Sequence, residues 1–297
     1  MKIAVAADLH LRGDRPLCRT DSDWIDTQRN DLRSLFKASD DCDELWIVGD
    51  VFHIPRVSTE CLAMAMAEFM LASEHIKICI LAGNHDLPEH NYANLDRCSL
   101  GVMLKVFNEL NSGLGVSLSA HPFGHDDLEE ANKSGIWATH QLTFPDDSAR
   151  PFPDLGRTAQ ELLDMAPNCR LIVTGDYHHG YVYHGADGRI VVTPGCMNVQ
   201  VADMADYEPR IYVVDTETMA VEERKLGTNR EGTVRTDYLD EEKARSEAIE
   251  AAANITMDAG AVKLDFRGNL ETLAEKAGDA CKGVVRKVLD TINGDRQ

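Results

Sequence analysis

Apolar runs alternate with amphipathic segments in the first third of the chain. Three runs, Ile3–Ala7, Glu44–Val48 and Ile76–Ala82, are short and almost continuously apolar, which is typical of β-strands buried on both faces. The two segments between them repeat apolar positions at helical spacing. This alternation predicts an α/β fold built in layers. The first expected helix has an apolar face of Ile25, Leu32, Leu35 and Phe36. The second begins after Pro55 and Ser58 and has an apolar face of Leu62, Met66, Phe69 and Met70.

The middle of the chain predicts further strands around a short helix. Gly135–Thr139 and Arg170–Thr174 have the composition of strands, and Thr158 and Glu161 have the spacing of a capping box. From residue 181 to 214, short apolar stretches alternate with turns at 185–188 and 194–195, which favours a second, more antiparallel sheet. The expected fold class is therefore α/β, a two-sheet β-sandwich flanked by helices.

The composition changes near Gly227. Residues 228–258 are polar and charge-rich, residues 262–267 alternate as in a half-buried strand, and Asn269 is placed to cap a final helix. We expect a small C-terminal α+β appendage at 228–297. The apolar stripe of the final helix fits packing within its own domain, docking to a partner or formation of a homodimer. The stripe consists of Leu270, Ala274, Ala277, Cys281, Val284 and Val288.

Bulk composition narrows the class of protein. The 297 residues carry 30 Lys and Arg against 50 Asp and Glu, a net charge of −20, and we find no basic stripe of the kind that grips a nucleic-acid backbone unaided. The eight cysteines are scattered without a Cys-x-x-Cys pair, which favours reduced, structural thiols. No apolar stretch approaches the ~20 residues that span a bilayer, and no signal-peptide pattern is present. We therefore expect a cytoplasmic protein that has no contact with membrane.

Polar side chains with metal-binding chemistry follow five of the predicted strands. They come directly after the apolar runs, and the carboxyl ends of strands are where sites form in open α/β sheets. Glycines at 49, 83 and 175 let the backbone turn sharply to present these ligands. We expect the side chains to meet at one edge of the fold. The segments are Asp8-Leu9-His10, Gly49-Asp50, Gly83-Asn84-His85-Asp86, His140 and Gly175-Asp176-Tyr177-His178.

These residue types suit a pair of divalent cations. In an extended chain Asp8 and His10 face the same way and can bind one ion together, while Asp50 on a neighbouring strand can bridge two ions. Asn84 offers a neutral amide oxygen, and His140 offers an imidazole. This mixture of ligands suits Mn²⁺, Fe or Zn²⁺. Two such ions ~3.5–4 Å apart would clamp a phosphate and lower the pKa of a bridging water.

The order and types of these motifs resemble the calcineurin-like metallophosphoesterase superfamily over about the first 215 residues, with Gly83-Asn84-His85-Asp86 as the most specific element. Three further segments are similar to the SbcD-type DNA-repair nucleases: Gly49-Asp50-Val51-Phe52-His53, Thr139-His140-Gln141 and Thr193-Pro194-Gly195. The resemblance implies a catalytic domain at 1–227 and a shortened capping or partner-docking region at 228–297. It also implies DNA as substrate and an SMC-like coiled-coil ATPase as partner.

The resemblance also assigns roles to individual residues. Two sets of ligands, joined through Asp50, would hold the two ions. His85 would contact the phosphate or protonate the leaving oxygen, and His53 would help to position the substrate. The first ion would be held by Asp8, His10, Asp50 and His178, and the second by Asp50, Asn84, His140 and the residue at 176.

The segment from Gly175 departs from the family pattern Gly-His-x-His, because Asp176 stands where the family has its first histidine. We expect Asp176 to ligate in place of the imidazole, and His179 is the alternative. With three ionised carboxylates, two divalent ions leave a net charge of about +1 at the site instead of about +2. The site should therefore favour Mn²⁺ or Mg²⁺ over Zn²⁺.

The motifs leave three hypotheses for function. The first is a DNA exo- or endonuclease of SbcD type, in which a hydroxide activated by two metals attacks the phosphodiester and His85 assists departure of the sugar oxygen. The second is a stand-alone phosphatase or phosphodiesterase on nucleotides or small phosphoesters, which the acidic composition favours. The third is a catalytically impaired binding subunit, which the change at Asp176 favours.

Overall fold

The computed structural model of the chain describes residues 1–109, 114–115, 120–121, 132–133, 135–152, 154–229 and 232–236. The chain divides into two compact units, Met1–Val234 and Arg235–Gln297, and every helix and strand given below lies in the first. The strand expected at 262–267 and the helix expected from Asn269 lie outside the described residues. The appendage at 228–297 and its boundary at Gly227 therefore stay predictions.

The first sheet carries the N-terminal apolar runs. Strand β1 pairs in parallel with β2, β2 with β3 and β3 with β4, whereas β12 pairs antiparallel with β1 and β13 antiparallel with β12. The three strands predicted between residues 3 and 82 are confirmed, each within one residue of its predicted bounds. In the order β13-β12-β1-β2-β3-β4, the strands are Val221–Lys225, Arg210–Asp215, Lys2–Ala6, Glu44–Val48, Lys77–Leu81 and Leu114–Gly115.

The second sheet is mostly parallel, which corrects the prediction of a more antiparallel one. Strands β10 and β11 form the antiparallel hairpin expected from the turn at 185–188, but β11, β9, β6 and β5 pair in parallel. The strand expected near residue 214 is β12, which crosses back to the first sheet. The crossover connections decide this pairing, and the local apolar pattern does not record them. In the order β10-β11-β9-β6-β5, the strands are Tyr181–His184, Ile190–Thr193, Leu171–Thr174, Ile136–Thr139 and Ala120–His121.

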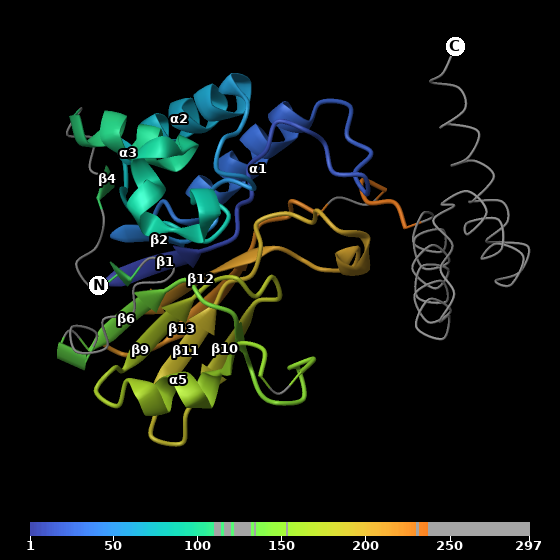
Figure 1. Cartoon of the computed structure of the whole chain (residues 1–297). Coiled ribbons are helices and arrows are strands. Elements are labelled where there is room, and N and C mark those ends of the chain that lie inside the picture. Colours follow the sequence, from blue (N-terminus) through green and yellow to red (C-terminus); the bar gives the residue numbers. More distant parts are fainter. Residues whose placement is uncertain are drawn as a thin grey trace, which may run out of the picture. The chain divides into compact units, whose positions relative to one another are not determined.

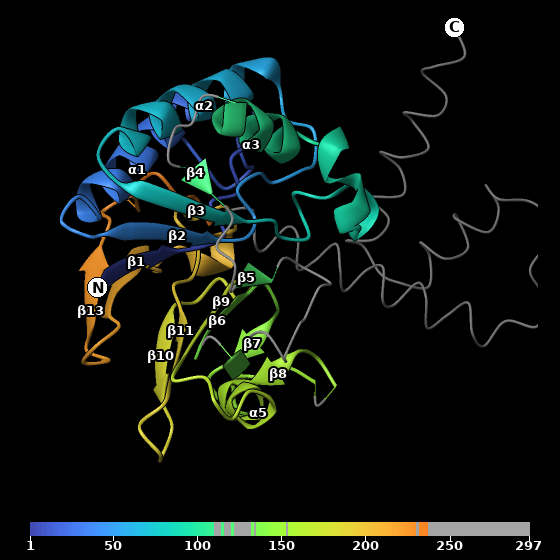
Figure 2. The same cartoon turned by 90° about the vertical axis from the view of Figure 1, so that its left-hand side faces the viewer.

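Helices cover both outer faces of the pair of sheets. Helices α1 (Trp24–Ala38), α2 (Thr59–Ser73) and α3 (Ser99–Glu109) lie over the first sheet, and α5 (Ala159–Met165) lies over the second (Figure 1 and Figure 2). Successive residues of β1 point to opposite sides, so Ala4 lies in the core under α1–α3 and Val5 in the core between the sheets. A third core lies between the second sheet and α5. The predicted class, a two-sheet sandwich flanked by helices, is confirmed.

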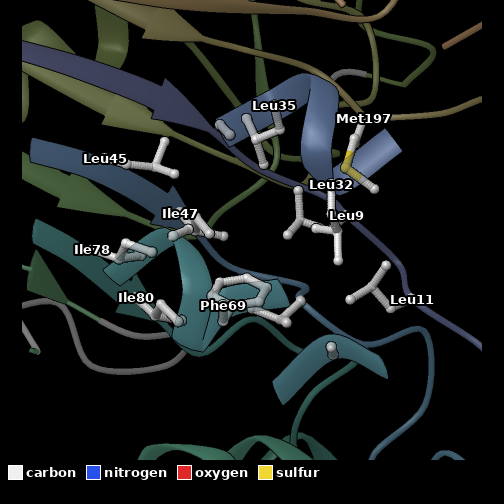
Figure 3. Close-up of a cluster of buried hydrophobic side chains, with 14 of the residues drawn as sticks. Leu9, Leu11, Leu32, Leu35, Leu45, Ile47, Phe69, Ile78, Ile80 and Met197 are labelled. Atoms are coloured by element: carbon white, nitrogen blue, oxygen red, sulfur yellow. The ribbon is translucent and has the colours of Figure 1, made fainter. Parts of the chain in front are cut away.

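The core under α1–α3 reaches the segment that follows β1. Leu9 and Leu11 alternate with the polar Asp8 and His10, and both leucines are completely buried (Figure 3). Met197, from the loop after β11, joins the same core. The apolar side chains therefore anchor the backbone on which two candidate ligands stand.

Helix α2 buries a different face from the predicted one. Phe69 is buried as expected, but Leu62 and Met66 are only half-buried and Met70 is 42% exposed. The helix is apolar nearly all the way round, so its sequence pattern does not define which side meets the core. Ser58 caps the helix by accepting a hydrogen bond from the N–H of Cys61 at 3.2 Å. The buried positions are Cys61, Met64, Ala65, Glu68, Phe69 and Ala72.

The capping box predicted for α5 is confirmed. The hydroxyl of Thr158 accepts from the N–H of Glu161 at 3.2 Å, and the Glu161 carboxylate accepts from the N–H of Thr158 at 2.7 Å. This motif needs only residues three apart, which is why the sequence alone locates it. The short elements complete the fold: β7 (Thr143–Phe144), β8 (Arg157–Thr158), and the 3₁₀ helices η1 (Pro88–His90), η2 (Tyr92–Arg97) and η3 (Ala202–Met204).

The cysteines agree with the prediction of structural thiols. All seven within the described part of the chain are free and buried. Among the described residues, none of the helices combines the length and apolar character that a membrane-spanning helix requires.

Candidate metal centre

The candidate site residues meet where the carboxyl ends of the two sheets adjoin. His10 Nε2 lies 3.1 Å from His178 Nε2, and His140 Nε2 lies 3.0 Å from Asn84 Oδ1, so strand ends of both sheets build one centre. The roles of these residues as ligands stay predictions. The residues follow β1 (Asp8, His10), β2 (Asp50), β3 (Asn84, His85), β6 (His140) and β9 (Asp176, His178).

Four of these residues have a left-handed backbone. The angle φ is 51° at Asp8, 45° at His10, 52° at Asp50 and 74° at Asp176, a conformation that costs roughly 1–2 kcal/mol for each residue other than glycine. The N–H of Asp8 donates to the Gly49 carbonyl at 3.1 Å, and the N–H of His10 donates to the Asp50 carbonyl at 2.9 Å. The expectation of an extended chain from Asp8 to His10 is therefore wrong. Strain held at several polar residues together is typical of a functional site.

The glycines of the centre are needed mainly for close approach. A Cβ on Gly49 would lie 1.9 Å from His140 Nδ1, one on Gly175 would lie 2.5 Å from the same atom, and one on Gly83 would lie 2.1 Å from Asp50 Oδ1. Among the three, Gly49 alone has a positive φ, 87°. The predicted sharp turn therefore holds for Gly49, whereas Gly83 and Gly175 leave room for neighbouring side chains.

Three groups of side chains, among the described residues, place their ligand atoms within 4.8 Å of one another. Asp8 belongs to two of the groups, and one of these also contains Asp50 and His140. These three residues are 1%, 0% and 1% exposed. Buried carboxylates are stable only when positive charge compensates them, so the side chains around Asp8 are suited to hold divalent metal. The groups are Asp8, His10 and His178; Asp8, Asp50 and His140; and His10, His53 and His85.

His140 is held in one orientation by the backbone. Its Nδ1 lies 2.8 Å from the Val48 carbonyl and donates to it, since a carbonyl oxygen only accepts. Its Nε2 then faces Asn84 Oδ1 at 3.0 Å and Asp50 Oδ2 at 3.4 Å. An imidazole fixed through one nitrogen by a backbone carbonyl is the usual arrangement of a metal-binding histidine.

His85 is fixed in a similar way beside the carboxylates. Its Nδ1 donates to the His53 carbonyl at 2.8 Å, and its backbone N–H donates to Asp50 Oδ1 at 2.9 Å. The His85 ring stacks on the His53 ring with 5.4 Å between centroids and 25° between planes. Burial, assisted by Arg12, lowers the pKa of His53 to about 4. His53 is therefore neutral at neutral pH and can donate or accept a hydrogen bond without adding charge.

The surroundings of one Asp50 oxygen show whether a metal ion fits the centre. Asp50 Oδ2 is buried and accepts no hydrogen bond from any residue that the structure describes. Two imidazole nitrogens approach it, His140 Nε2 at 3.4 Å and His10 Nε2 at 3.7 Å. A buried carboxylate oxygen without a donor is costly, and a divalent ion among carboxylate, imidazole and amide ligands removes that cost. The side chains present therefore fit a metal ion.

The ionisable groups of the centre show the same demand for positive charge. Burial raises the pKa of Asp8 well above its usual range. Burial also acts on Asp50 and His140, but their mutual attraction outweighs it, so the pKa of Asp50 is lowered and that of His140 is raised to about 10. Burial lowers the pKa of His10 and of His178. Without a metal ion, His140 therefore carries the compensating positive charge at neutral pH.

The carboxylate of Asp176 lies outside the three ligand groups found among the described residues. The side chain is half-buried, and the backbone N–H donates to both carboxylate oxygens of Asp8 at 3.2 Å. His179, the alternative ligand, is exposed, and its ring contacts those of Tyr177 and Tyr207 at 5.5 and 5.6 Å between centroids. Ligation by Asp176 stays a prediction.

Asp86 stabilises the loop that carries Asn84 and His85. Its carboxylate accepts from the backbone N–H groups of Gly83 at 2.9 Å, Phe52 at 2.8 Å and Val51 at 3.2 Å. Burial, with the nearby charge of Asp50, raises the pKa of Asp86 to about 7. The side chain thus joins the strand ends of β2 and β3.

The loop after β11 supports the centre, a role that neither the turn predicted at 194–195 nor the Thr-Pro-Gly resemblance at 193–195 indicated. The N–H of Met197 donates to the Asp8 carbonyl at 3.3 Å, and the side chain of Gln200 donates to the His10 carbonyl at 2.9 Å. Gln200 and His10 are 190 positions apart, and no local pattern marks such a contact.

The fold and its centre together define a class, the hydrolases that cleave phosphoesters with metal ions held at the strand ends of a two-sheet sandwich. The family model described as calcineurin-like phosphoesterase matches residues 1–154, and the chain belongs to that family. Among curated proteins, none matches the chain.

Several solved structures are similar to this chain over much of its length. The protein TT1561 of Thermus thermophilus is 11% identical with a TM-score of 0.46, and the match covers 76% of this chain and 98% of that one. An archaeal phosphodiesterase is 16% identical with a TM-score of 0.38, covering 76% and 99%. A dimetal phosphatase from Danio rerio is 11% identical with a TM-score of 0.47, covering 76% and 96%. The family assignment rests on the family model and not on these structures.

Proposed function

We propose that this chain is a metal-dependent phosphodiesterase that hydrolyses DNA with two divalent ions, as an exo- or endonuclease of SbcD type. Membership of the calcineurin-like phosphoesterase family supports a phosphoester as substrate. The observation that carries the proposal is that two ligand groups lie side by side, with the buried carboxylate of Asp8 next to that of Asp50, the residue expected to bridge the ions. Two ions ~3.5–4 Å apart need ligand groups that lie this close together.

When bound, the two ions supply Lewis acids for the phosphate and lower the pKa of the water molecule that attacks it. The side chains of this chain would hold them in two sets that share Asp50. The carboxylates favour Mn²⁺ or Mg²⁺ as the native ion, with Fe and Zn²⁺ as alternatives. The proposed sets are Asp8, His10, Asp50 and His178 for one ion, and Asp50, Asn84, His140 and Asp176 for the other.

His85 is the proposed general acid. Its Nδ1–H is bonded to the His53 carbonyl, so the proton for the departing sugar oxygen is one held on Nε2 in the imidazolium form, and its transfer leaves a neutral imidazole. Its backbone N–H is anchored on Asp50 Oδ1 at 2.9 Å, which ties the acid to a proposed ligand of both ions. His53, stacked on His85, is the proposed hydrogen-bond donor to a phosphate oxygen and so positions the substrate.

DNA binding by this chain requires positive charge from elsewhere, since its own net charge is −20. The two ions supply part of that charge at the scissile phosphate. An SMC-like coiled-coil ATPase that grips DNA is the proposed source of the rest, with region 228–297 as the docking element. A homodimer through the same region is the alternative assembly.

The test is degradation of an end-labelled oligonucleotide with Mn²⁺ by the wild type and two variants. His85→Ala should lower the rate by roughly 10²–10⁴-fold while the bound manganese stays unchanged. The matched control is His184→Ala, because His184 is exposed on β10 and lies in none of the ligand groups of the described residues. The proposed role of His85 is wrong if both variants degrade DNA at the wild-type rate.

Hydrolysis of small phosphoesters is a second candidate function, favoured by the acidic composition. Hydrolysis of bis(p-nitrophenyl) phosphate, with the oligonucleotide left intact, would support it in place of the nuclease. The position of the Asp176 carboxylate outside the ligand groups favours a third, a catalytically impaired binding subunit. Full manganese occupancy without turnover of either substrate would support that function.

A further inference from the structure

The backbone from Asp8 to His10 is bonded on two sides. Its N–H groups donate to the carbonyls of Gly49 and Asp50, at the end of β2. Its carbonyls accept from the loop at 194–200, which follows β11 of the second sheet: Met197 N–H donates to the Asp8 carbonyl, and Gln200 Nε2 donates to the His10 carbonyl at 2.9 Å. Gln200 is thus a side chain that bonds the carbonyl of His10 directly.

The amide of Gln200 is itself held in one orientation. Its Nε2 also donates to Asn198 Oδ1 at 3.0 Å, so both amide hydrogens have acceptors. Asn198 is 2% exposed and cannot turn into solvent. The donor that faces His10 is therefore fixed before any ion binds.

The loop that carries Gln200 is fastened to the centre and to the rest of the fold. The N–H of Cys196 donates to the His178 carbonyl at 3.0 Å. The hydroxyl of Thr228 donates to the Met197 carbonyl at 2.6 Å, and the guanidinium of Arg19 donates to the Val199 carbonyl at 3.4 Å. Gln200 therefore extends from a rigid support.

We propose that Gln200 is a positioning residue that holds His10 in its left-handed conformation and so fixes the imidazole in its ligand groups. This inference rests on the proposed function. His10 has φ of 45° and belongs to two of the three ligand groups, so relaxation of its backbone moves a ligand of the proposed first ion and a neighbour of His85. Supporting partners of metal ligands, when removed, typically weaken metal binding 10–100-fold.

The test compares Gln200→Met with Gln160→Met. Methionine keeps the length and apolar stem of glutamine but has no N–H to donate. Gln160 is exposed on α5, where its amide bonds to Asp164, so its replacement controls for the same chemical change away from the centre. Calorimetric titration with Mn²⁺ should show a dissociation constant raised about tenfold or more in Gln200→Met alone. Excess Mn²⁺ should restore kcat in that variant.

A second measurement separates this inference from the proposed function. Histidine-selective NMR spectra of the metal-free protein should show displaced ring resonances of His10 in Gln200→Met and not in Gln160→Met. Both this spectrum and the Mn²⁺ titration are independent of turnover, so a wild type that hydrolyses no phosphoester would refute the function and leave Gln200 testable. The inference is overturned if Gln200→Met binds Mn²⁺ within twofold of the wild type and leaves the His10 resonances in place, even where the variant unfolds at a lower temperature.

Discussion

Replacement of Gly83 by alanine tests the proposed centre through its backbone. The new Cβ would lie 2.1 Å from Asp50 Oδ1 and 2.4 Å from Asp50 N, whereas ordinary contact begins at 3.4 Å. To bring both contacts out to the ordinary distance, one of the two strand ends must move by roughly 1 Å. Asp50 cannot yield by rotating its side chain alone, because its backbone nitrogen is one of the two clashing atoms.

A displacement of ~1 Å at a catalytic group costs on the order of 10²-fold in rate. Overpacking at this buried site should also lower the free energy of unfolding by about 1–3 kcal/mol. Both are measurable, the first as Mn²⁺-dependent hydrolysis of a phosphodiester and the second by chemical denaturation.

The control for this substitution is Gly185→Ala. There the added Cβ meets Leu163 Cδ1 at 2.9 Å, Asp187 Oδ1 at 3.0 Å and the Arg189 carbonyl at 3.3 Å, so its two nearest neighbours are side-chain ends, and none of the three belongs to the centre. This variant should keep its activity. If Gly83→Ala hydrolyses the substrate within threefold of Gly185→Ala, the close packing of β3 on Asp50 has no part in catalysis and the reasoning is refuted.

Three further predictions concern single groups of the centre. Asp86→Asn puts an amide NH₂ against backbone N–H donors and should lower the free energy of unfolding by about 1–3 kcal/mol, measured by urea denaturation. Asp176→Ala should reduce bound manganese from two ions to one by elemental analysis, and unchanged stoichiometry would exclude Asp176 as a ligand. Because folding raises the pKa of His140 to about 10, protonation of this side chain stabilises the metal-free protein. That contribution is fully present below pH 6.5 and is lost as the pH rises through about 10. Mn²⁺ must displace that proton, so its affinity should rise about tenfold per pH unit between pH 6 and 8, and a pH-independent dissociation constant would contradict this.

The strands that carry the centre could be predicted because the apolar pattern of each strand reflects how deeply it is buried. β2 and β3 are buried on both faces and are therefore continuously apolar, and the polar residues that end them mark the carboxyl edge. The sheet that β12 joins could not be predicted, because its pairing with β1 depends on a crossover of about 200 residues that leaves no local trace. The buried face of α2 failed for a related reason, since an all-apolar helix offers several equivalent faces.

The chemical identity of the centre was accessible from the sequence, whereas its geometry was not. Carboxylate, imidazole and amide residues after strand ends indicate metal chemistry without any coordinates. The left-handed backbone at Asp8 and His10 could not be foreseen, because residues other than glycine adopt it only when tertiary hydrogen bonds hold it. Those bonds come from Gly49, Asp50 and the distant Gln200, and only the folded chain brings them together.

The centre joins two sheets, and this makes ion binding a matter of stability as well as catalysis. Asp8 and His10 extend from the first sheet and His178 and His140 from the second, so ions held among them would link the two carboxyl edges. An ion that binds only the folded chain at a hundred times its dissociation constant adds about 2.7 kcal/mol to the free energy of unfolding. Mn²⁺ should therefore raise the denaturation midpoint and a chelator should reverse the rise, with Gly185→Ala behaving as the wild type. A midpoint that responds to neither would mean that these side chains hold no ion in common, and the two-metal proposal would have to be given up.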